Sequence, residues 1–442
     1  MNIQSKHHPI ALITLFFFTV ICHLQEVYSA DGNNDWLQFL GNDGRGVATE
    51  SAPLRWSRDE NLQWSTVLPG RGWSSPVIAG GRVYVTAAIP LKSVGENTIR
   101  DGSNGEAVEN EVSEFDLCML IVDLDSGRLV KRVSVMVQND ERPSRMHGKN
   151  SHASPTPIVD GDRIFVHFGY QGTACLTLDG ELLWVNRDLY FPPTHGNGGS
   201  PILIGGKLIF TCDGGKDPNV IALEAETGEV AWRVHREVEA KKTFSFCTPS
   251  VIKVGDRDLV VVPGSDVVQA LDPVTGEVVW YLHYTGYSVV PKPVSVAGLV
   301  VLSTGFDQAT MLAIDPTGTG DVTDSKLVWE IDRNIPKTPS LIAHQGLIYT
   351  ISDDGIALCI DGASGDLLYR ERIGGNYSSS PIIAGDYIYF TSETGKTTVV
   401  RTGVDFDRVA ESDLEERTLA TMAFSEGAIL LRTDEALYRI SH

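Results

Sequence analysis

The sequence predicts an all-β protein, an eight-bladed β-propeller of four-stranded antiparallel blades, and three observations lead to this fold. A phrase ending in tryptophan occurs at Ala222–Trp232 and again at Ala270–Trp280, with looser copies along the chain. Tryptophans 184, 232, 280 and 329 follow one another at intervals of 48, 48 and 49 residues. A small residue and proline precede most of these units. A period of this size with four strands per unit is typical of propeller blades.

The repeated phrase contains the end of one strand, a tight turn and a second strand. Asp272 and Pro273 favour the opening of the turn, and Gly276 allows the positive φ that closes it. The valines that follow favour a strand, and Trp280 is large enough to seal one unit against the next. We therefore expect this turn to join the third and fourth strands of each blade.

The first two strands of each blade follow the small residue and proline. A short apolar stretch, a glycine turn and a second apolar stretch come next, which is the pattern of a β-hairpin. The first interval, from Pro76 to Pro157, is 81 residues, so the first blade carries an insertion at about residues 88–116. The markers are Ser75-Pro76, Thr156-Pro157, Ser200-Pro201, Thr248-Pro249, Lys292-Pro293, Thr338-Pro339, Ser380-Pro381 and, without the proline, Met422-Ala423.

The two ends of the chain complete one blade. The last unit ends at Leu437–Ile440 with no turn and no tryptophan strand, whereas Asn61–Val67 resembles a tryptophan strand with no unit before it. We expect the N-terminal strand to pair with the C-terminal blade, which closes the ring and removes its exposed edges.

Three segments precede or form this ring. Residues 1–30 are typical of a secretory signal peptide, residues 31–60 form a lead-in, and residues 61–442 form the propeller. We expect export to the periplasm or the extracellular space and no transmembrane segment. Cys22 suggests a lipoprotein alternative, but Ile21 is bulkier than a lipidation signal prefers.

Composition narrows the class of partner. The formal net charge of −21 argues against nucleic acid and anionic membrane surfaces. Five cysteines follow the leader, and most lie in apolar strand sequence, so we expect them to be small buried side chains. The alternative is one disulfide between neighbouring strands. We expect a monomer.

Polar loops gather on one face of the predicted ring. Loops that enter the innermost strands and loops that join the two middle strands emerge together, and the Asp…Thr-Gly turns emerge on the other face. We interpret the former as a polar, mixed-charge site for an anionic or carbonyl-rich ligand; the alternative is a hydrogen-bond network that only cross-links the blades. The candidate ligand-binding residues are Arg71, Trp73, His147, Lys149, Asn150, His152, His195, Asn197, Asp213, Asp307, Asn376 and Tyr377.

No catalytic residue or metal ligand is assigned. The three histidines 147, 152 and 195 match no compact zinc motif, and Asp213 and Asp217 lack the twelve-residue pattern of a calcium loop. No Gly-x-Ser-x-Gly elbow is present.

The phrase Ala-x-Asp-x-x-Thr-Gly-x-x-x-Trp resembles the tryptophan-docking motif of propellers related to pyrroloquinoline-quinone (PQQ) enzymes, over about residues 35–442. That superfamily contains quinoprotein alcohol dehydrogenases. It also contains cofactor-free relatives, such as the propeller lipoprotein of the outer-membrane β-barrel assembly machine. The whole chain looks most similar to secreted PQQ-like propeller proteins of planctomycete-type bacteria.

The resemblance implies two functions. Relatives that hold PQQ use a disulfide between adjacent cysteines, a tryptophan, a calcium ion and an aspartate base. This chain has no adjacent cysteines, and Trp73, Arg71 and Asp307 fill only part of such a set. We therefore expect neither PQQ nor calcium. The prediction is a binding or scaffold protein for a protein partner or a small polar or anionic ligand, as in envelope or outer-membrane protein assembly. The alternative is a divergent quinoprotein-like oxidoreductase that uses PQQ and calcium.

Overall fold

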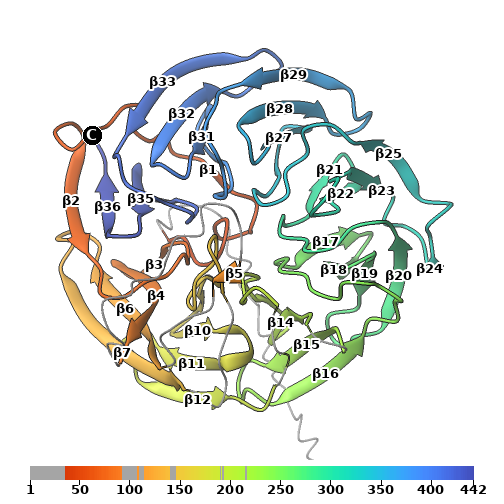
Figure 1. The fold of residues 1–442 in the computed structure, drawn as a ribbon, viewed down its shortest axis with the longest axis horizontal. Coiled ribbons are helices and arrows are strands. Elements are labelled where there is room, and N and C mark those ends of the chain that lie inside the picture. The colour runs from red at the N-terminus through yellow and green to blue at the C-terminus, as the bar shows by residue number, and fades with distance from the viewer. Residues whose placement is uncertain are drawn as a thin grey trace, which may run out of the picture. The chain divides into compact units, whose positions relative to one another are not determined.

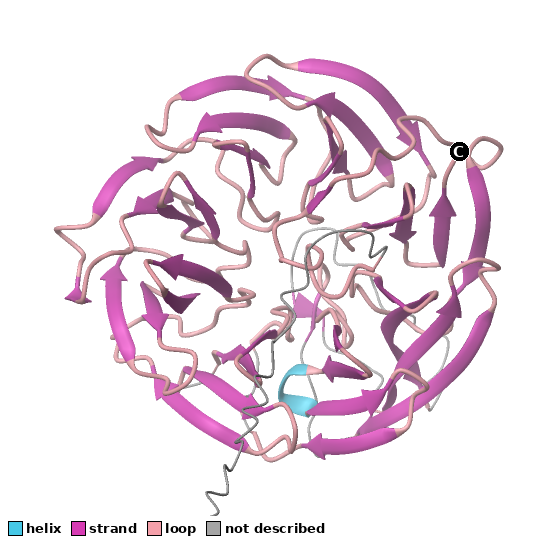
Figure 2. Ribbon diagram, turned by 180° about the vertical axis from the view of Figure 1, so that it is seen from behind, coloured by secondary structure: helices cyan, strands magenta, loops and turns pink. Residues whose placement is uncertain are grey.

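Eight sheets of four or five strands are arranged as a ring, and two short strands, described below, form a separate small sheet (Figure 1). This computed structural model describes residues 35–91, 107–108, 114–139, 146–189, 191, 194–214 and 217–442. The expected signal peptide, residues 1–30, lies outside the described residues. Figure 2 shows strands throughout and one short helical turn, the 3₁₀ segment η1 (Gly169–Gln171). No helix in the described part has the length and hydropathy needed to cross a bilayer.

Each sheet of the ring is one blade, and its four principal strands run antiparallel, as the sequence predicted. From the inside outward, blade 1 contains β3 (Val77–Ala79), β4 (Arg82–Pro90), β6 (Phe115–Asp123) and β7 (Leu129–Gln138); blade 2 contains β9 (Ile158–Asp160), β10 (Arg163–His167), β11 (Thr173–Thr177) and β12 (Leu182–Asn186); blade 3 contains β13 (Ile202–Ile204), β14 (Lys207–Cys212), β15 (Asn219–Glu224) and β16 (Val230–His235); blade 4 contains β17 (Ser250–Val254), β18 (Arg257–Gly264), β19 (Val267–Leu271) and β20 (Val278–His283).

The second half of the ring repeats this order. Blade 5 contains β21 (Val294–Val296), β22 (Leu299–Ser303), β23 (Met311–Ile314) and β25 (Leu327–Ile331); blade 6 contains β26 (Ile342–His344), β27 (Leu347–Ile351), β28 (Ile356–Asp361) and β29 (Leu367–Arg372); blade 7 contains β30 (Ile382–Ala384), β31 (Tyr387–Thr391), β32 (Lys396–Arg401) and β33 (Asp407–Asp413); blade 8 contains β34 (Ala423–Ser425), β35 (Ala428–Arg432), β36 (Ala436–Ile440) and β2 (Leu62–Val67). A short fifth strand, β24 (Gly320–Asp321), adds to blade 4.

The two chain ends share blade 8. Strand β2 pairs antiparallel with β36, with Ser65 opposite Tyr438, so the predicted closure is confirmed. Trp64 of β2 donates its indole N–H to the Leu124 carbonyl of blade 1 at 3.0 Å. The N-terminal strand therefore supplies the tryptophan that the last repeat lacks.

Tryptophans dock blades 2, 3, 5 and 8 onto the turn of the next blade. Trp232 of blade 3 donates to the Pro273 carbonyl of blade 4 at 3.1 Å. In the same turn, the Asp272 carboxylate accepts the Thr275 N–H at 3.0 Å. Gly276 has a φ of +75°, and a Cβ there would lie 2.7 Å from the Trp232 ring. The glycine is needed both for the turn and for the close approach of the indole.

The small residue before proline links successive blades. The Ser75 N–H donates to the Thr156 hydroxyl at 3.0 Å, and the Thr156 N–H donates to the Ser200 hydroxyl at 2.9 Å. Blade 6 differs from the sequence prediction, because Ser340, not Thr338, accepts the bond from the Lys292 N–H. This series of bonds between blades, the hydroxyl belt, also joins Ser200 to Thr248, Ser340 to Ser380, and Ser380 to Thr421.

The lead-in lies along the innermost strands. Its strand β1 (Val47–Ala48) pairs in parallel with β30 of blade 7, and the Leu37 carbonyl accepts the Val159 N–H of blade 2 at 2.8 Å. Trp36 is buried and lies 5.9 Å from the Phe424 ring of blade 8. Because residues 36–48 contact blades on opposite sides of the ring, this segment, the axial plug, crosses its centre.

Lysine replaces the belt hydroxyl in blade 5. Lys292 occupies the position held by serine or threonine in the other blades, and its Nζ donates to the Gly44 carbonyl of the axial plug at 2.6 Å. The ammonium is buried, and burial lowers the pKa of Lys292 to about 8. The break in the belt thus supplies a contact between the ring and the plug.

The insertion in blade 1 begins later than the sequence suggested. The β4–β6 ladder continues to the pair Pro90 and Phe115, so the excursion lies between these residues. Part of it, β5 (Ala107–Val108), pairs with β8 (Met146–His147). The five cysteines 118, 175, 212, 247 and 359 are free and buried, so the bridge left open by the sequence is not formed.

Candidate functional site

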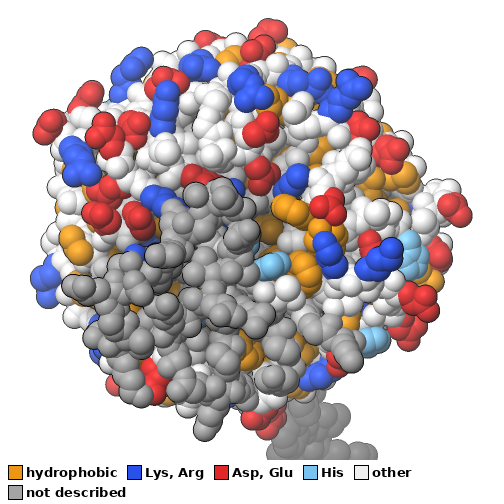
Figure 3. All heavy atoms as spheres, viewed as in Figure 1, with side chains coloured by type: hydrophobic (Ala, Val, Ile, Leu, Met, Phe, Trp, Pro, Cys, Tyr) orange, Lys and Arg blue, Asp and Glu red, His pale blue; other side chains and the backbone are white. Residues whose placement is uncertain are grey.

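Two sets of loops share one face of the ring. Because strand direction alternates within a blade, the loops that enter the innermost strands emerge beside those that join the middle strands. Figure 3 shows hydrophobic side chains, a histidine and basic side chains near the middle of one face. We call the face that carries these loops the loop face.

Two predicted histidines meet on the loop face. The His147 and His195 rings lie 5.6 Å apart, and the His195 carbonyl accepts the His147 N–H at 3.1 Å. Asn150 donates its side-chain amide to the same carbonyl at 3.0 Å. The pKa of His195 is lowered, mainly by burial and to a smaller extent by electrostatic interaction with His147 and Lys242. The His195 Nδ1 is buried without a hydrogen-bond partner. The pair therefore keeps one ring nitrogen, that of His195, without a hydrogen-bond partner.

The third histidine has a different setting. The His152 ring lies 4.2 Å from Phe115, and its Nδ1 lies 3.0 Å from the Gln138 oxygen. Both partners belong to blade 1. Burial lowers the pKa of His152 to about 4, so this side chain packs as a neutral group against the first blade.

Basic side chains connect loops across the ring. Lys149 forms an ion pair of 2.8 Å with Glu393 of blade 7. Arg417 donates to the Gly148 carbonyl at 3.0 Å and lies 5.5 Å from the Trp73 ring. The predicted residues Trp73 and Lys149 thus meet Arg417 and Glu393, and these contacts connect loops that are remote in the sequence.

Arg71, Asn376 and Tyr377 lie apart from these contacts. Arg71 is exposed, and its backbone pairs with Ala88. Asn376 is exposed, and its carbonyl accepts the Glu393 N–H at 2.7 Å. Tyr377 is 2% exposed within the core, and burial raises its pKa to about 12. Its position differs from the exposed role predicted for it, because the ring packs inward while its N–H fixes the loop to the Asp353 carbonyl.

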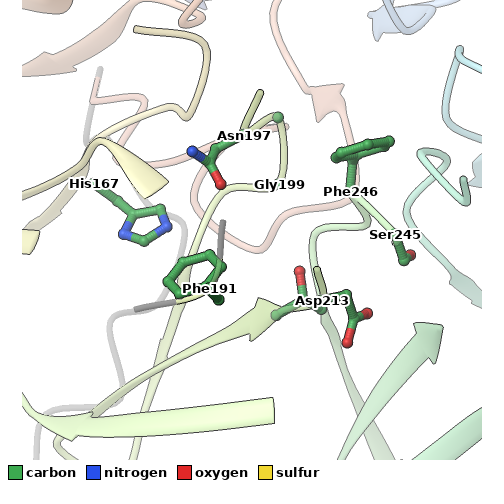
Figure 4. A pocket seen from close by; sticks show the side chains of 9 residues that line it. His167, Phe191, Asn197, Gly199, Asp213, Ser245 and Phe246 are labelled. Carbon is green, nitrogen blue, oxygen red and sulfur yellow. The ribbon is translucent and has the colours of Figure 1, made fainter. Parts of the chain in front are cut away.

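A small pocket lies beside the inner ends of blades 2, 3 and 4. Asn197 and Asp213 line it, as predicted residues, together with His167, Phe191, Thr211, Ser245 and Phe246 (Figure 4). It has room for about one water molecule. The Asp213 carboxylate accepts the Arg236 Nε–H at 2.8 Å, and both side chains are about 1% exposed.

Asp213 is the most perturbed acid of this pocket. Burial raises its pKa to about 6 although Arg236 opposes the change, and its Oδ2 is buried without a hydrogen-bond partner. His167 bonds through Nδ1 to the Thr173 hydroxyl at 2.8 Å. Burial lowers the pKa of His167 to about 3, so it is neutral. Sequence reasoning missed His167 and Arg236, although each stands where a strand meets a loop.

A row of aromatic rings follows the middle of the loop face. We call His147, His195, Phe244, Tyr287 and Phe306 the aromatic arc; its successive ring centroids lie 5.6, 5.2, 5.7 and 6.0 Å apart. Most of its rings are partly exposed, and Phe306 is 50% exposed.

Two lysines and the predicted Asp307 border the arc. The Lys242 Nζ lies 3.8 Å from the Tyr287 ring centre, and the Lys337 Nζ lies 5.0 Å from that of Phe306. The Tyr287 hydroxyl accepts a bond from Lys242 at 2.6 Å and donates one to Asp307 at 2.9 Å. The border of the arc thus contains ammonium groups held at exposed aromatic rings.

The described residues do not fit the calcium and PQQ arrangement of the quinoprotein enzymes. Within them, no three histidine, cysteine or acidic side chains converge to hold a metal ion. The cysteines of the ring are buried, so none can form the bridge that covers a quinone. We therefore derive no quinone chemistry from this site.

Comparison with known proteins gives two groups of relatives. Residues 177–408, just over half the chain, match the model of a family described as "Outer membrane protein assembly factor BamB". The protein of that name from Burkholderia pseudomallei is 24% identical over 88% of this chain and 91% of its own.

Methanol dehydrogenase [cytochrome c] subunit 1 from Methylorubrum extorquens is 32% identical, but over 31% of this chain and 24% of its own. The chain thus spans about a quarter of that relative. The crystal structure of quinohemoprotein alcohol dehydrogenase from Comamonas testosteroni aligns with a TM-score of 0.65 at 12% identity, over 92% of this chain and 80% of its own. At that identity the likeness concerns the fold alone.

Proposed function

Because the chain belongs to the family described as outer membrane protein assembly factor BamB, we propose that it is an exported scaffold protein of the cell envelope. In this proposal it is a monomer that holds a protein partner on its loop face, in the periplasm or outside the cell. The leader at residues 1–30 directs its export. Its similarity to secreted PQQ-like propellers of planctomycete-type bacteria remains a prediction from the sequence.

One observation supports a scaffold over an enzyme. Acids of the loop face are engaged in holding loops together: Glu393 with Lys149, Asp307 with Tyr287, and Asp353 with the Lys337 N–H and the Thr338 hydroxyl. A carboxylate in such a network positions its neighbours and has little freedom to serve as a proton acceptor. The hydroxyl belt and docked tryptophans add rigidity, which lowers the entropic penalty of binding a partner.

A second candidate, a divergent oxidoreductase, is favoured by Asp213. This acid lines a pocket, has a raised pKa and keeps one oxygen without a partner, which are properties of a proton acceptor. The similarity to the dehydrogenases, over a quarter of their length, points the same way.

Two measurements separate the candidates. The mature protein is cross-linked in envelope extracts, beside a variant with Lys149→Ala and Arg417→Ala, which disconnects loops on the partner-holding face. Capture of a defined protein that the variant loses supports the scaffold. Calorimetry with PQQ and calcium, with Asp213→Asn as the comparison, tests the enzyme; binding followed by alcohol-dependent dye reduction would overturn the scaffold proposal.

A further inference from the structure

We propose that the aromatic arc, with Lys242 and Lys337, is the docking surface for an extended partner segment that alternates acidic and aromatic side chains. This inference rests on the proposed scaffold function and names the chemistry of the partner. Nothing in the similarity to known proteins points to these residues. The argument uses charge, ring geometry and spacing.

Charge complementarity favours an acidic partner. The protein carries a formal net charge of −21, yet the middle of its loop face presents ammonium groups. Within the described residues, neither Lys242 nor Lys337 forms an ion pair; each instead lies near an aromatic ring. The lowered pKa of His195 has Lys242 among its causes, which indicates a positive local potential. An ammonium at the face of a ring keeps N–H donors for a carboxylate.

The ring geometry favours a chain over a flat molecule. His195 and Phe244 meet at an interplanar angle of 84°, and Phe244 and Tyr287 meet at 82°. Perpendicular neighbours present alternating edges and faces along the arc, not the parallel walls that would stack on one planar acid. The pocket beneath Phe246 has room for about one water molecule, so it gives no deep slot either.

The spacing suits an extended backbone. Successive rings of the arc lie 5.2 to 6.0 Å apart. Side chains on one face of a strand repeat at roughly 6.6 Å, since each residue rises about 3.3 Å. A segment of roughly seven residues would therefore place four side chains of one face at the four gaps in the arc, while its other side chains reach the lysines. Extended peptides bind in this manner through side-chain pockets.

The test uses a synthetic octapeptide, Asp-Phe-Glu-Tyr-Asp-Phe-Glu-Tyr with a fluorophore, and anisotropy at low and physiological salt. We expect binding to the full mature protein that weakens roughly tenfold or more in Lys242→Glu/Lys337→Glu, because two attractive charges become repulsive. Phe306→Ala should weaken it as well, and this ring is half exposed, so the fold tolerates the change. The matched control is Lys131→Glu/Lys253→Glu, with the same charge change at exposed lysines remote from the arc.

Each outcome bears on the proposal. The proposal would be overturned if a peptide with lysine in place of each acidic residue bound as tightly as the octapeptide. It would also be overturned if the octapeptide bound the Lys242→Glu/Lys337→Glu variant as tightly as the natural protein. Binding of free PQQ to the arc without binding of the octapeptide would overturn it as well, since a planar acid would then be the ligand. If cross-linking captures a protein partner equally well with Lys242→Glu/Lys337→Glu and with its control Lys131→Glu/Lys253→Glu, the scaffold function stands and the proposed docking surface is wrong. If no partner is captured although the octapeptide binds at the arc, the scaffold function fails alone.

Discussion

Replacing Lys292 with methionine tests how the ring holds its axial plug. The side chain lies at the centre of the ring, and burial lowers its pKa from 10.5 to about 8. Because one pKa unit corresponds to about 1.4 kcal/mol, the buried ammonium carries a penalty of about 3 kcal/mol that the neutral amine does not. Its bond to Gly44 offsets that penalty by about 1.5 to 3 kcal/mol, since the donor is charged.

The sign of the pH dependence follows from these values. Between pH 8 and 10.5 the unfolded chain keeps a proton on Lys292 that the folded chain has lost, so folded stability rises with pH in this window. Below pH 8 both states are protonated and the full penalty is present. Lys292→Met has no such dependence. The free energy of unfolding of the natural protein, minus that of the variant, should therefore rise by about 3 kcal/mol from pH 7 to pH 10.5.

The assay is urea unfolding followed by tryptophan fluorescence at several pH values. Lys131→Met is the matched control, because Lys131 also donates to a backbone carbonyl of the next blade, that of Asp179, but from an exposed position. The Lys292 effect is the excess over this control. A difference that falls with pH, or that equals the control, would refute the assignment of a penalised buried charge.

Three further perturbations test the rest of the ring by the same unfolding assay. Gly276→Ala should destabilise the protein by about 1–3 kcal/mol or more, because alanine is strained at positive φ and its Cβ would strike Trp232; an unchanged midpoint would contradict the docking role. Thr156→Val keeps the shape but leaves the buried Ser75 N–H without its acceptor, and should lower stability by about 1–3 kcal/mol; a neutral effect would mean that the hydroxyl belt is dispensable. Burial lowers the pKa of His167 to about 3, so on acidification the imidazole is protonated in the unfolded chain before it is in the folded one. The free energy of unfolding therefore falls by up to about 1.4 kcal/mol per pH unit below pH 6.5. His167→Gln should flatten that acid slope relative to the natural protein, and parallel slopes would argue against a buried neutral imidazole.

Local sequence patterns predicted the ring because each blade is built from neighbours in the chain. Strand alternation, the Asp272–Gly276 turn and the spacing of the tryptophans are all local signals, and they led to eight blades and to their closure through β2. The shift in blade 6 from Thr338 to Ser340 is a local exception, because Pro339 precedes the belt hydroxyl and Leu341 follows it.

The site was less predictable, since its contacts join loops that are far apart in sequence. Nothing near Lys149 in the chain indicates that its partner is Glu393. Likewise, Arg236 meets Asp213 only because the ends of β14 and β16, which are 23 residues apart in sequence, lie together in blade 3. Tyr377 turns into the core although its loop reaches the surface. Residue type and loop position identified the loop face, but not which side chains meet there.

Closure through β2 also has a consequence for biosynthesis. Strand β2 is made early and its partner β36 last, about 370 residues later. At about 5–20 residues per second, the early strand waits roughly 20 to 75 seconds for its native neighbour. An unpaired strand edge is a template for aggregation during this time. Gln63 and Ser65 alternate with Leu62, Trp64 and Thr66 along β2, so one face of the waiting strand stays largely polar while its tryptophan can already settle on blade 1.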